Sequence, residues 1–142
     1  MSLPSTQLPH SLDRIVQRLA RSTEPKRKYE LLITLAQRLK PFPDDEKTPE
    51  NKVSGCASQV FVVANLEDGK VQFEGDSDSQ LVKGLVALLV EGLSGLTPQE
   101  IVELSPEFIK ATGLDVSLTP SRANGFYNIL AKMKQKSQAF ID

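Results

Sequence analysis

Apolar residues recur at every third or fourth position in the first part of the chain, which predicts two amphipathic helices. The first follows Ser11, a suitable N-cap, and ends near Arg21. The second begins at about Pro25, because proline suits the first turn of a helix, and its apolar positions reach Leu39. The basic run at residues 26–28 in its first turn is expected to face solvent.

A different pattern follows and predicts a β-hairpin. Residues 59–66 form an apolar, β-branched run, and residues 70–75 alternate apolar and polar side chains. The dipeptide Asp68-Gly69 between them is a strong signal for the tight turn of an antiparallel pair. A third short strand around residues 51–53 would complete a small antiparallel sheet of about three strands.

The segment after the hairpin predicts the central helix of the fold. Either Ser77 or Asp78 is expected to cap it. Apolar residues then occupy most of its faces over residues 81–93, which is typical of a buried helix. Because Gly84 and Gly92 each cost such a helix about 1 kcal/mol relative to alanine, we expect close packing at these positions or, for Gly92, the end of the helix.

Threonine and serine followed by proline predict the starts of the remaining helices. Thr97-Pro98 with Glu100 has the pattern of a capping box, and Ser105-Pro106 begins a segment that ends near Gly113. Thr119-Pro120 begins the last helix, whose expected core residues are Ala123, Phe126, Tyr127, Leu130 and Met133. Helices packed on one face of a small antiparallel sheet make this an α+β fold.

Length and composition restrict the function. We expect residues 1–142 to form a single domain, with a flexible arm at residues 1–10. The net charge of −1 gives no reason to expect binding to nucleic acid or to a membrane. The chain has one cysteine, which excludes an internal disulfide and a cysteine-based zinc or iron–sulfur site within one chain, so we expect no metal. A lone thiol favours a reducing location, and we expect the cytoplasm.

That cysteine, Cys56, lies in a segment of small residues directly before the first predicted strand. The segment reads Asn-Lys-Val-Ser-Gly-Cys-Ala-Ser-Gln-Val over residues 51–60, and its polar character predicts a loop. Gly55 permits backbone conformations that other residues avoid, so the loop could swing. Since free cysteines are often inert core residues, these residues alone leave a structural and a reactive role both open.

Three motifs in order resemble the SufE family, which accepts sulfur from a cysteine desulfurase during iron–sulfur cluster assembly. They are Asn-x-Val-x-Gly-Cys-x-Ser-x-Val at residues 51–60, Gly-Asp-Ser-Asp at 75–78 and Pro-Ser-Arg-x-Asn-Gly at 120–125. The resemblance extends from about Leu12 to about Lys136, and it implies an α+β fold shared with iron–sulfur scaffold proteins. The chain departs from the family at two positions, Ala57, where glutamine is common, and Phe61, where tryptophan is common.

The resemblance implies that Cys56 carries the sulfur as a persulfide and that Asp78 and Arg122 support the cysteine site. Arg122 lies in the first turn of the last helix, where a cation is mildly unfavourable unless a carboxylate or a partner recruits it. The implied partners are a pyridoxal phosphate-dependent cysteine desulfurase and an iron–sulfur scaffold complex. The residues that we expect to contact them are Asn51, Val53, Gln59, Lys83 and Asn124.

A thiol-dependent enzyme, either a peroxidase or a hydrolase, is the alternative function. It would need a resolving cysteine or a histidine base, and the sole histidine, His10, lies in the expected arm. An iron–sulfur scaffold would need more ligands than one cysteine. We therefore expect a sulfur carrier that stimulates the desulfurase without being an enzyme itself and that needs no cofactor of its own. Because an exposed persulfide is easily lost, Cys56 is expected to rest partly turned away from water.

Overall fold

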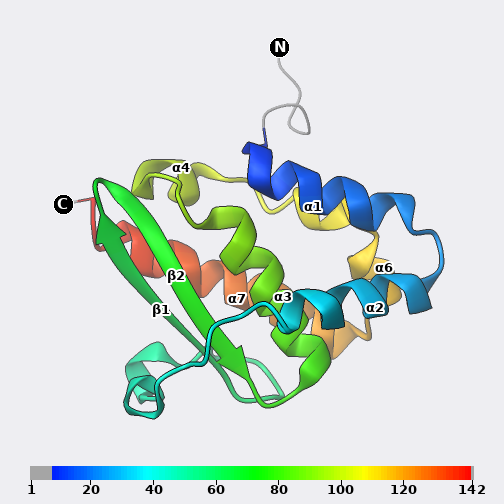
Figure 1. Ribbon diagram of the computed structural model, residues 1–142, viewed down its shortest axis with the longest axis horizontal. Helices are drawn as coiled ribbons and strands as arrows, with labels where there is room; N and C mark the ends of the chain where they lie inside the picture. Colours follow the sequence, from blue (N-terminus) through cyan, green and yellow to red (C-terminus); the bar gives the residue numbers. More distant parts are fainter. Residues whose placement is uncertain (1–7, 142) are drawn as a thin grey trace.

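The computed structural model describes residues 8–141 and has the predicted α+β architecture (Figure 1). The central helix α3 contacts α1 and α2 on one side and strand β2 and helix α7 on the other. In Figure 1 the hairpin lies on the left with α7 behind it, and α1 and α2 lie towards the right. The elements are α1 (His10–Arg21), α2 (Pro25–Ala36), η2 (Asp44–Glu46), η3 (Pro49–Asn51), β1 (Val60–Glu67), β2 (Lys70–Ser77), α3 (Gln80–Leu93), α4 (Pro98–Glu103), α5 (Phe108–Ala111), α6 (Leu114–Ser117) and α7 (Pro120–Gln138).

The hairpin forms as predicted. Strands β1 and β2 pair in antiparallel register along their full lengths, from Val60 opposite Ser77 to Glu67 opposite Lys70. The two turn residues at positions 68 and 69 have φ angles of 51° and 78°. Two consecutive positive φ angles match the right-handed twist of the strands, which is why an Asp-Gly pair favours this turn.

The expected third strand is wrong, because the segment before Cys56 forms only an isolated bridge. Lys52 bridges Phe61, and the backbone N–H of Val53 donates to the carbonyl of Val60 at 2.8 Å. The helical turn η3 ends directly before this bridge, and the chain turns again at Gly55, where φ is 82°. Extended pairing therefore has no room to continue, and the sheet within residues 8–141 has two strands.

Helix α3 is central and buried as predicted, but its cap differs. Strand β2 continues to Ser77, so the helix starts later, and the side chain of Ser79 accepts from the backbone N–H of Val82. Close packing at the two glycines is confirmed. A Cβ at Gly84 would lie 2.3 Å from the carbonyl oxygen of Leu32, and one at Gly92 would lie 2.7 Å from Leu12 Cδ1.

The first two helices show three differences from expectation. Helix α1 begins at His10, after Pro9 as N-cap, so this histidine belongs to a helix rather than to the expected arm; residues 1–7 of that arm lie outside the described part. Helix α2 ends at Ala36 rather than near Leu39. Lys28, expected to face solvent, is buried because its ammonium donates to the carbonyl oxygens of Leu19 at 2.5 Å and Thr112 at 2.9 Å.

The predicted helix starts at Thr97 and Thr119 are confirmed, whereas α5 begins at Phe108, with Glu107 as N-cap, rather than at Ser105-Pro106. The Thr97 hydroxyl accepts from the Glu100 N–H at 3.2 Å, and the Glu100 carboxylate accepts from the Thr97 N–H at 2.9 Å. The Thr119 side chain accepts from the Arg122 N–H and so caps α7. Helix α6 was not predicted; it follows Gly113, whose φ of 77° reverses the chain after α5.

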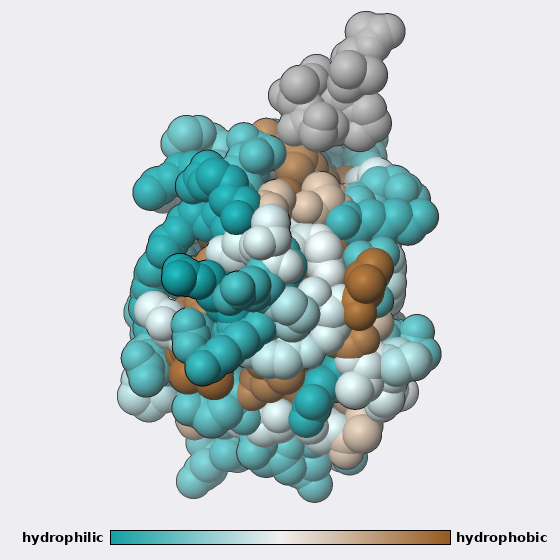
Figure 2. All heavy atoms as spheres, turned by 90° about the vertical axis from the view of Figure 1, so that its right-hand side faces the viewer, coloured by the Kyte–Doolittle hydropathy of each residue, from teal (hydrophilic) through white to brown (hydrophobic). Residues whose placement is uncertain are grey.

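The core face of α7 agrees with the prediction except that Ile129 is fully buried while Tyr127 is half-buried. On the face of the molecule drawn in Figure 2, hydrophilic residues cover much of the surface and hydrophobic ones form small, separate patches. No helix within residues 8–141 is long and apolar enough to cross a membrane.

Candidate functional site

Cys56 lies in the loop between η3 and β1 and packs against the first half of α7. Its Sγ is 3.9 Å from the carbonyl oxygen of Gly125, and its side chain is half-buried, as the sequence analysis expects. Burial removes water from the charged form and thereby raises the pKa of the Cys56 thiol above its ordinary value. In this conformation the thiol is mostly protonated at neutral pH and is a weak nucleophile.

Helix α7 provides the surface on which the cysteine loop rests. Arg122, Gly125 and Asn128 are spaced by three residues and therefore lie on one face of the helix. A Cβ at Gly125 would lie 3.5 Å from Cys56 Sγ, an ordinary contact distance, so the glycine leaves room directly over the thiol. One turn further on, the side-chain amide of Asn128 donates to the carbonyl oxygen of Gly55 at 3.3 Å.

Two features of position 55 favour glycine. Its φ of 82° lies in the left-handed region, and a Cβ there would lie 2.5 Å from the side-chain nitrogen of Asn128. The sequence analysis singles out Gly55 for loop freedom, whereas here the residue lets the loop approach α7 closely. Val53 and Val60 on either side are buried and anchor the loop.

A hollow of about 320 Å³ opens beside the thiol. Arg122 is the one charged residue among those that line it, and its side chain is exposed. Within residues 8–141 no carboxylate lies within 4.0 Å of its guanidinium. The structure thus brings Arg122 to the hollow of Cys56, as the family resemblance implies. The lining residues are Cys56, Ala57, Ser58, Val82, Thr119, Ser121, Arg122 and Gly125.

Asp78 supports the loop from its other end rather than lining the hollow. Its carboxylate accepts from the backbone N–H of Gln59 at 3.1 Å, and its own N–H donates to the Gln59 carbonyl at 3.2 Å. This reciprocal pair fastens the end of the cysteine loop to the end of β2. Lys83, one turn into α3, pairs with Asp76 at 3.5 Å.

The five expected partner contacts differ in accessibility. Gln59 and Asn124 are exposed, whereas Val53 is 2% exposed and cannot contact a partner in this conformation. Asn51 is half-buried, and its side-chain oxygen accepts from Lys136 at 2.7 Å. Val53 therefore acts in packing, and a contact role stays a prediction for the other four residues.

Asn128 is the residue at this site that the sequence analysis did not single out. It lies outside the three motifs, and its contact with Gly55 spans 73 positions of the chain. A signal was nevertheless present, because Asn128 is one helical turn beyond Gly125 and on the same face as Arg122.

Comparison with known proteins places these features in one family. The model of the SufE family, described as Fe-S metabolism associated domain, matches residues 13–137. An uncharacterized SufE-like protein of Synechocystis is 59% identical over 138 residues, which cover 97% of this chain and 87% of that protein. The cysteine desulfuration protein SufE of Plasmodium vivax is 41% identical over 122 residues; the match covers 83% of this chain and about half, 48%, of that protein.

The fold agrees with this assignment. The solution structure of a hypothetical protein from Thermus thermophilus superposes with a TM-score of 0.79 at 26% identity, covering 94% of this chain and 97% of that one. The family match includes the cysteine loop, both strands and nearly all of α7. The chain therefore belongs to the SufE family.

Proposed function

We propose that this chain accepts sulfur from a cysteine desulfurase onto Cys56 and carries it as a persulfide. The observation that carries the proposal is the arrangement of the thiol: it is half-buried, fits over Gly125 and opens into a hollow that Arg122 lines. The Plasmodium vivax relative is named a cysteine desulfuration protein, which supports the same role.

The chemistry is a thiol–persulfide exchange. The Cys56 thiolate attacks the terminal sulfur of a persulfide on the desulfurase, and a new sulfur–sulfur bond forms on Cys56. The sulfur–sulfur bond of the donor breaks, and the donor cysteine leaves as a thiolate that takes up the proton lost by Cys56. No net oxidation occurs. Arg122 lines the same hollow, and a guanidinium that comes close to the sulfur during transfer would favour the thiolate and the persulfide anion over their protonated forms.

Transfer requires the loop to move. A half-buried Cys56 cannot reach a sulfur held in another protein, so we infer that docking of the desulfurase draws the loop outward from α7. A free-energy gap of a few kcal/mol between the two loop positions is small enough for a binding partner to reverse. The contacts that hold the resting position are the Asn128 hydrogen bond and the packing of the thiol on Gly125.

The wider role follows from the chemistry. Clearing sulfur from the desulfurase frees it for another turnover, so the chain acts as an activator and not as an enzyme itself. The sulfur then passes to an iron–sulfur scaffold. Pyridoxal phosphate belongs to the desulfurase, and the carrier needs no cofactor. A lone cysteine stays a free thiol in a reducing compartment, and we propose the cytoplasm.

Incubation with a cysteine desulfurase and L-cysteine, followed by intact-mass measurement, tests the proposal. We expect the wild-type chain to gain the mass of one sulfur atom, and this gain to disappear on reduction with dithiothreitol. The Cys56→Ser variant should fold normally, gain no mass and fail to stimulate the desulfurase, since a hydroxyl is a far poorer nucleophile. Full stimulation by a folded Cys56→Ser variant would contradict sulfur transfer through this residue.

A further inference from the structure

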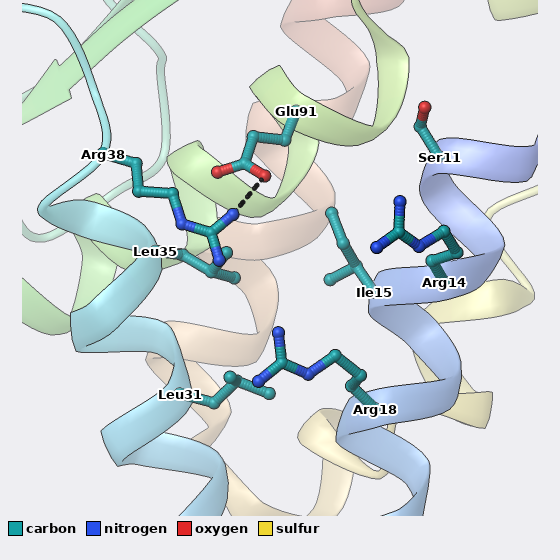
Figure 3. A pocket seen from close by; sticks show the side chains of 8 residues that line it. All are labelled: Ser11, Arg14, Ile15, Arg18, Leu31, Leu35, Arg38 and Glu91. Carbon is teal, nitrogen blue, oxygen red and sulfur yellow. Dashed lines mark hydrogen bonds and ion pairs between the residues drawn. The ribbon is translucent and has the colours of Figure 1, made fainter.

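A basic groove lies between α1 and α2, on residues that take no part in the cysteine site (Figure 3). We call it the α1–α2 groove. It consists of two adjoining hollows of about 250 and 270 Å³, which share Arg18 and Leu31. The first is lined by Ser11, Arg14, Ile15, Arg18, Leu31, Leu35, Arg38 and Glu91, and the second by Arg18, Ser22, Arg27, Glu30, Leu31 and Thr34.

Three arginines dominate the first hollow. Figure 3 shows the guanidinium groups of Arg14 and Arg18 extending from α1, and that of Arg38 extending from beyond the end of α2, into the space between the helices. Arg38 has a carboxylate partner, Glu91, at 3.0 Å. Within residues 8–141, Arg14 and Arg18 have no carboxylate within 4.0 Å. Two positive charges in this hollow are therefore uncompensated.

The second hollow is also lined by more positive than negative side chains. Its charged lining residues are Arg18, Arg27 and Glu30. Arg27 is 4.0 Å from Glu24, and both side chains are more than 70% exposed (72% and 73%), so this pair is weak. Across both hollows the lining holds four arginines against two glutamates, an excess of two positive charges in a chain whose net charge is −1.

The floor between the arginines is apolar. Ile15 and Leu31 are half-buried, and Leu35 beneath them is buried. A guanidinium presents a planar fork that pairs with a carboxylate through two hydrogen bonds. A complementary occupant therefore carries carboxylates on both sides of an apolar group that covers Ile15 and Leu31.

We propose that the α1–α2 groove is a docking site for an acidic segment of a partner protein, with carboxylates flanking an apolar side chain. A protein segment fits better than a small anion for two reasons. The arginines that line the groove are exposed, whereas a small-molecule pocket encloses most of its ligand. The two hollows also form an elongated surface, which a chain segment can follow from Arg38 to Arg27.

The α1–α2 groove lies on different residues from the cysteine site. Residues of α1, α2, the turn after α2 and α3 line the groove, whereas the cysteine loop, α3 and α7 with its cap line the hollow of Cys56. The two linings have no residue in common. A segment held in the groove thus contacts none of the residues that line the hollow of Cys56, so docking and sulfur exchange use separate surfaces. This inference goes beyond the sulfur-acceptor role and does not depend on it.

Peptide binding to paired charge-reversal variants tests the proposal. The probe is a short fluorescein-labelled peptide of glutamate pairs separated by single leucines, measured by fluorescence anisotropy at low and high salt. We expect the double variant Arg14→Glu/Arg18→Glu to bind it about tenfold more weakly than wild type, because like charges then face each other. The control is Lys70→Glu/Lys110→Glu, which makes the same change of charge at exposed residues outside the groove. Its affinity should stay within twofold of wild type.

Three outcomes would overturn the proposal. Absence of binding by the wild type at millimolar protein, or equal losses in both double variants, would show that the groove has no special affinity for acidic segments. Displacement of the peptide by equimolar inorganic phosphate would favour a small anion instead. The Cys56→Ser variant should bind the peptide as wild type does, so a failure of sulfur transfer is distinguishable from a failure of docking. Arg14 and Arg18 are exposed, and melting temperatures should confirm that their variants fold.

Discussion

Replacing Asn128 with alanine should release the cysteine loop without altering the thiol itself. In the resting position the Asn128 amide donates to the carbonyl oxygen of Gly55 at 3.3 Å. A hydrogen bond of this kind contributes about 1 kcal/mol net, within a range of about 0.5 to 1.5. Since about 1.4 kcal/mol corresponds to a factor of ten in a population ratio, losing about 1 kcal/mol raises the population of the outward loop relative to the resting loop about fivefold.

Alkylation of Cys56 by iodoacetamide reads out this ratio. The resting thiol is half-buried and its pKa is raised by burial, so reaction proceeds mainly from the outward loop. We therefore expect the Asn128→Ala variant to be alkylated about fivefold faster than wild type at neutral pH. The rate is followed by intact mass under reducing conditions.

The matched control is Gln135→Ala, an exposed amide on the same helix. It should leave both the alkylation rate and the melting temperature close to wild type. If Asn128→Ala and Gln135→Ala react at the same rate as wild type, the amide does not hold the loop. Asn128→Ala could instead react faster because the whole domain unfolds more often. In that case its melting temperature will fall, and its alkylation rate will rise with denaturant in step with the unfolded fraction.

Three further predictions follow. Arg122→Ala should weaken desulfurase stimulation more than stability, because an exposed arginine contributes little to folding; unchanged stimulation at unchanged melting temperature would place Arg122 outside the mechanism. The rate of Cys56 alkylation should rise with pH to a midpoint above that of a small thiol, because burial raises its pKa, and the ordinary midpoint should return in denaturant. Because the folded state favours the protonated thiol, Cys56 contributes to stability below the ordinary pKa of a thiol. This contribution is lost as the pH rises through the pKa of Cys56 in the folded state. Gly84→Ala should destabilise the fold by about 3 kcal/mol in urea titrations, since a Cβ would lie 2.3 Å from a Leu32 backbone oxygen that cannot move freely; a variant as stable as wild type would show that α2 and α3 separate at little cost.

The sequence by itself determined the features that depend on neighbouring residues. The Asp68-Gly69 turn, the capping box at Thr97 and the start of α7 after Thr119 all formed as predicted. Each of these is a hydrogen bond or a backbone angle within four residues, so no distant contact can easily override it. The motifs around Cys56 and Arg122 likewise indicated the family, because residue type and order along the chain suffice for that.

Only the tertiary structure decided which residues meet across the chain. The sequence pattern predicts Lys28 to be part of a solvated basic run. It is buried instead, because its ammonium donates hydrogen bonds to backbone carbonyls of α1 and of the residue after α5. The third strand was lost because turns on either side of Lys52 allow one bridge only. Asn128 belongs to the cysteine site because it contacts Gly55, which lies 73 positions earlier in the chain. Arg14 and Arg38 line the same hollow because α1 and α2 both pack on α3. Long-range packing selects among locally equivalent polar residues: the spacing along α7 places Asn128 one turn beyond Gly125, but only the fold brings it to Gly55.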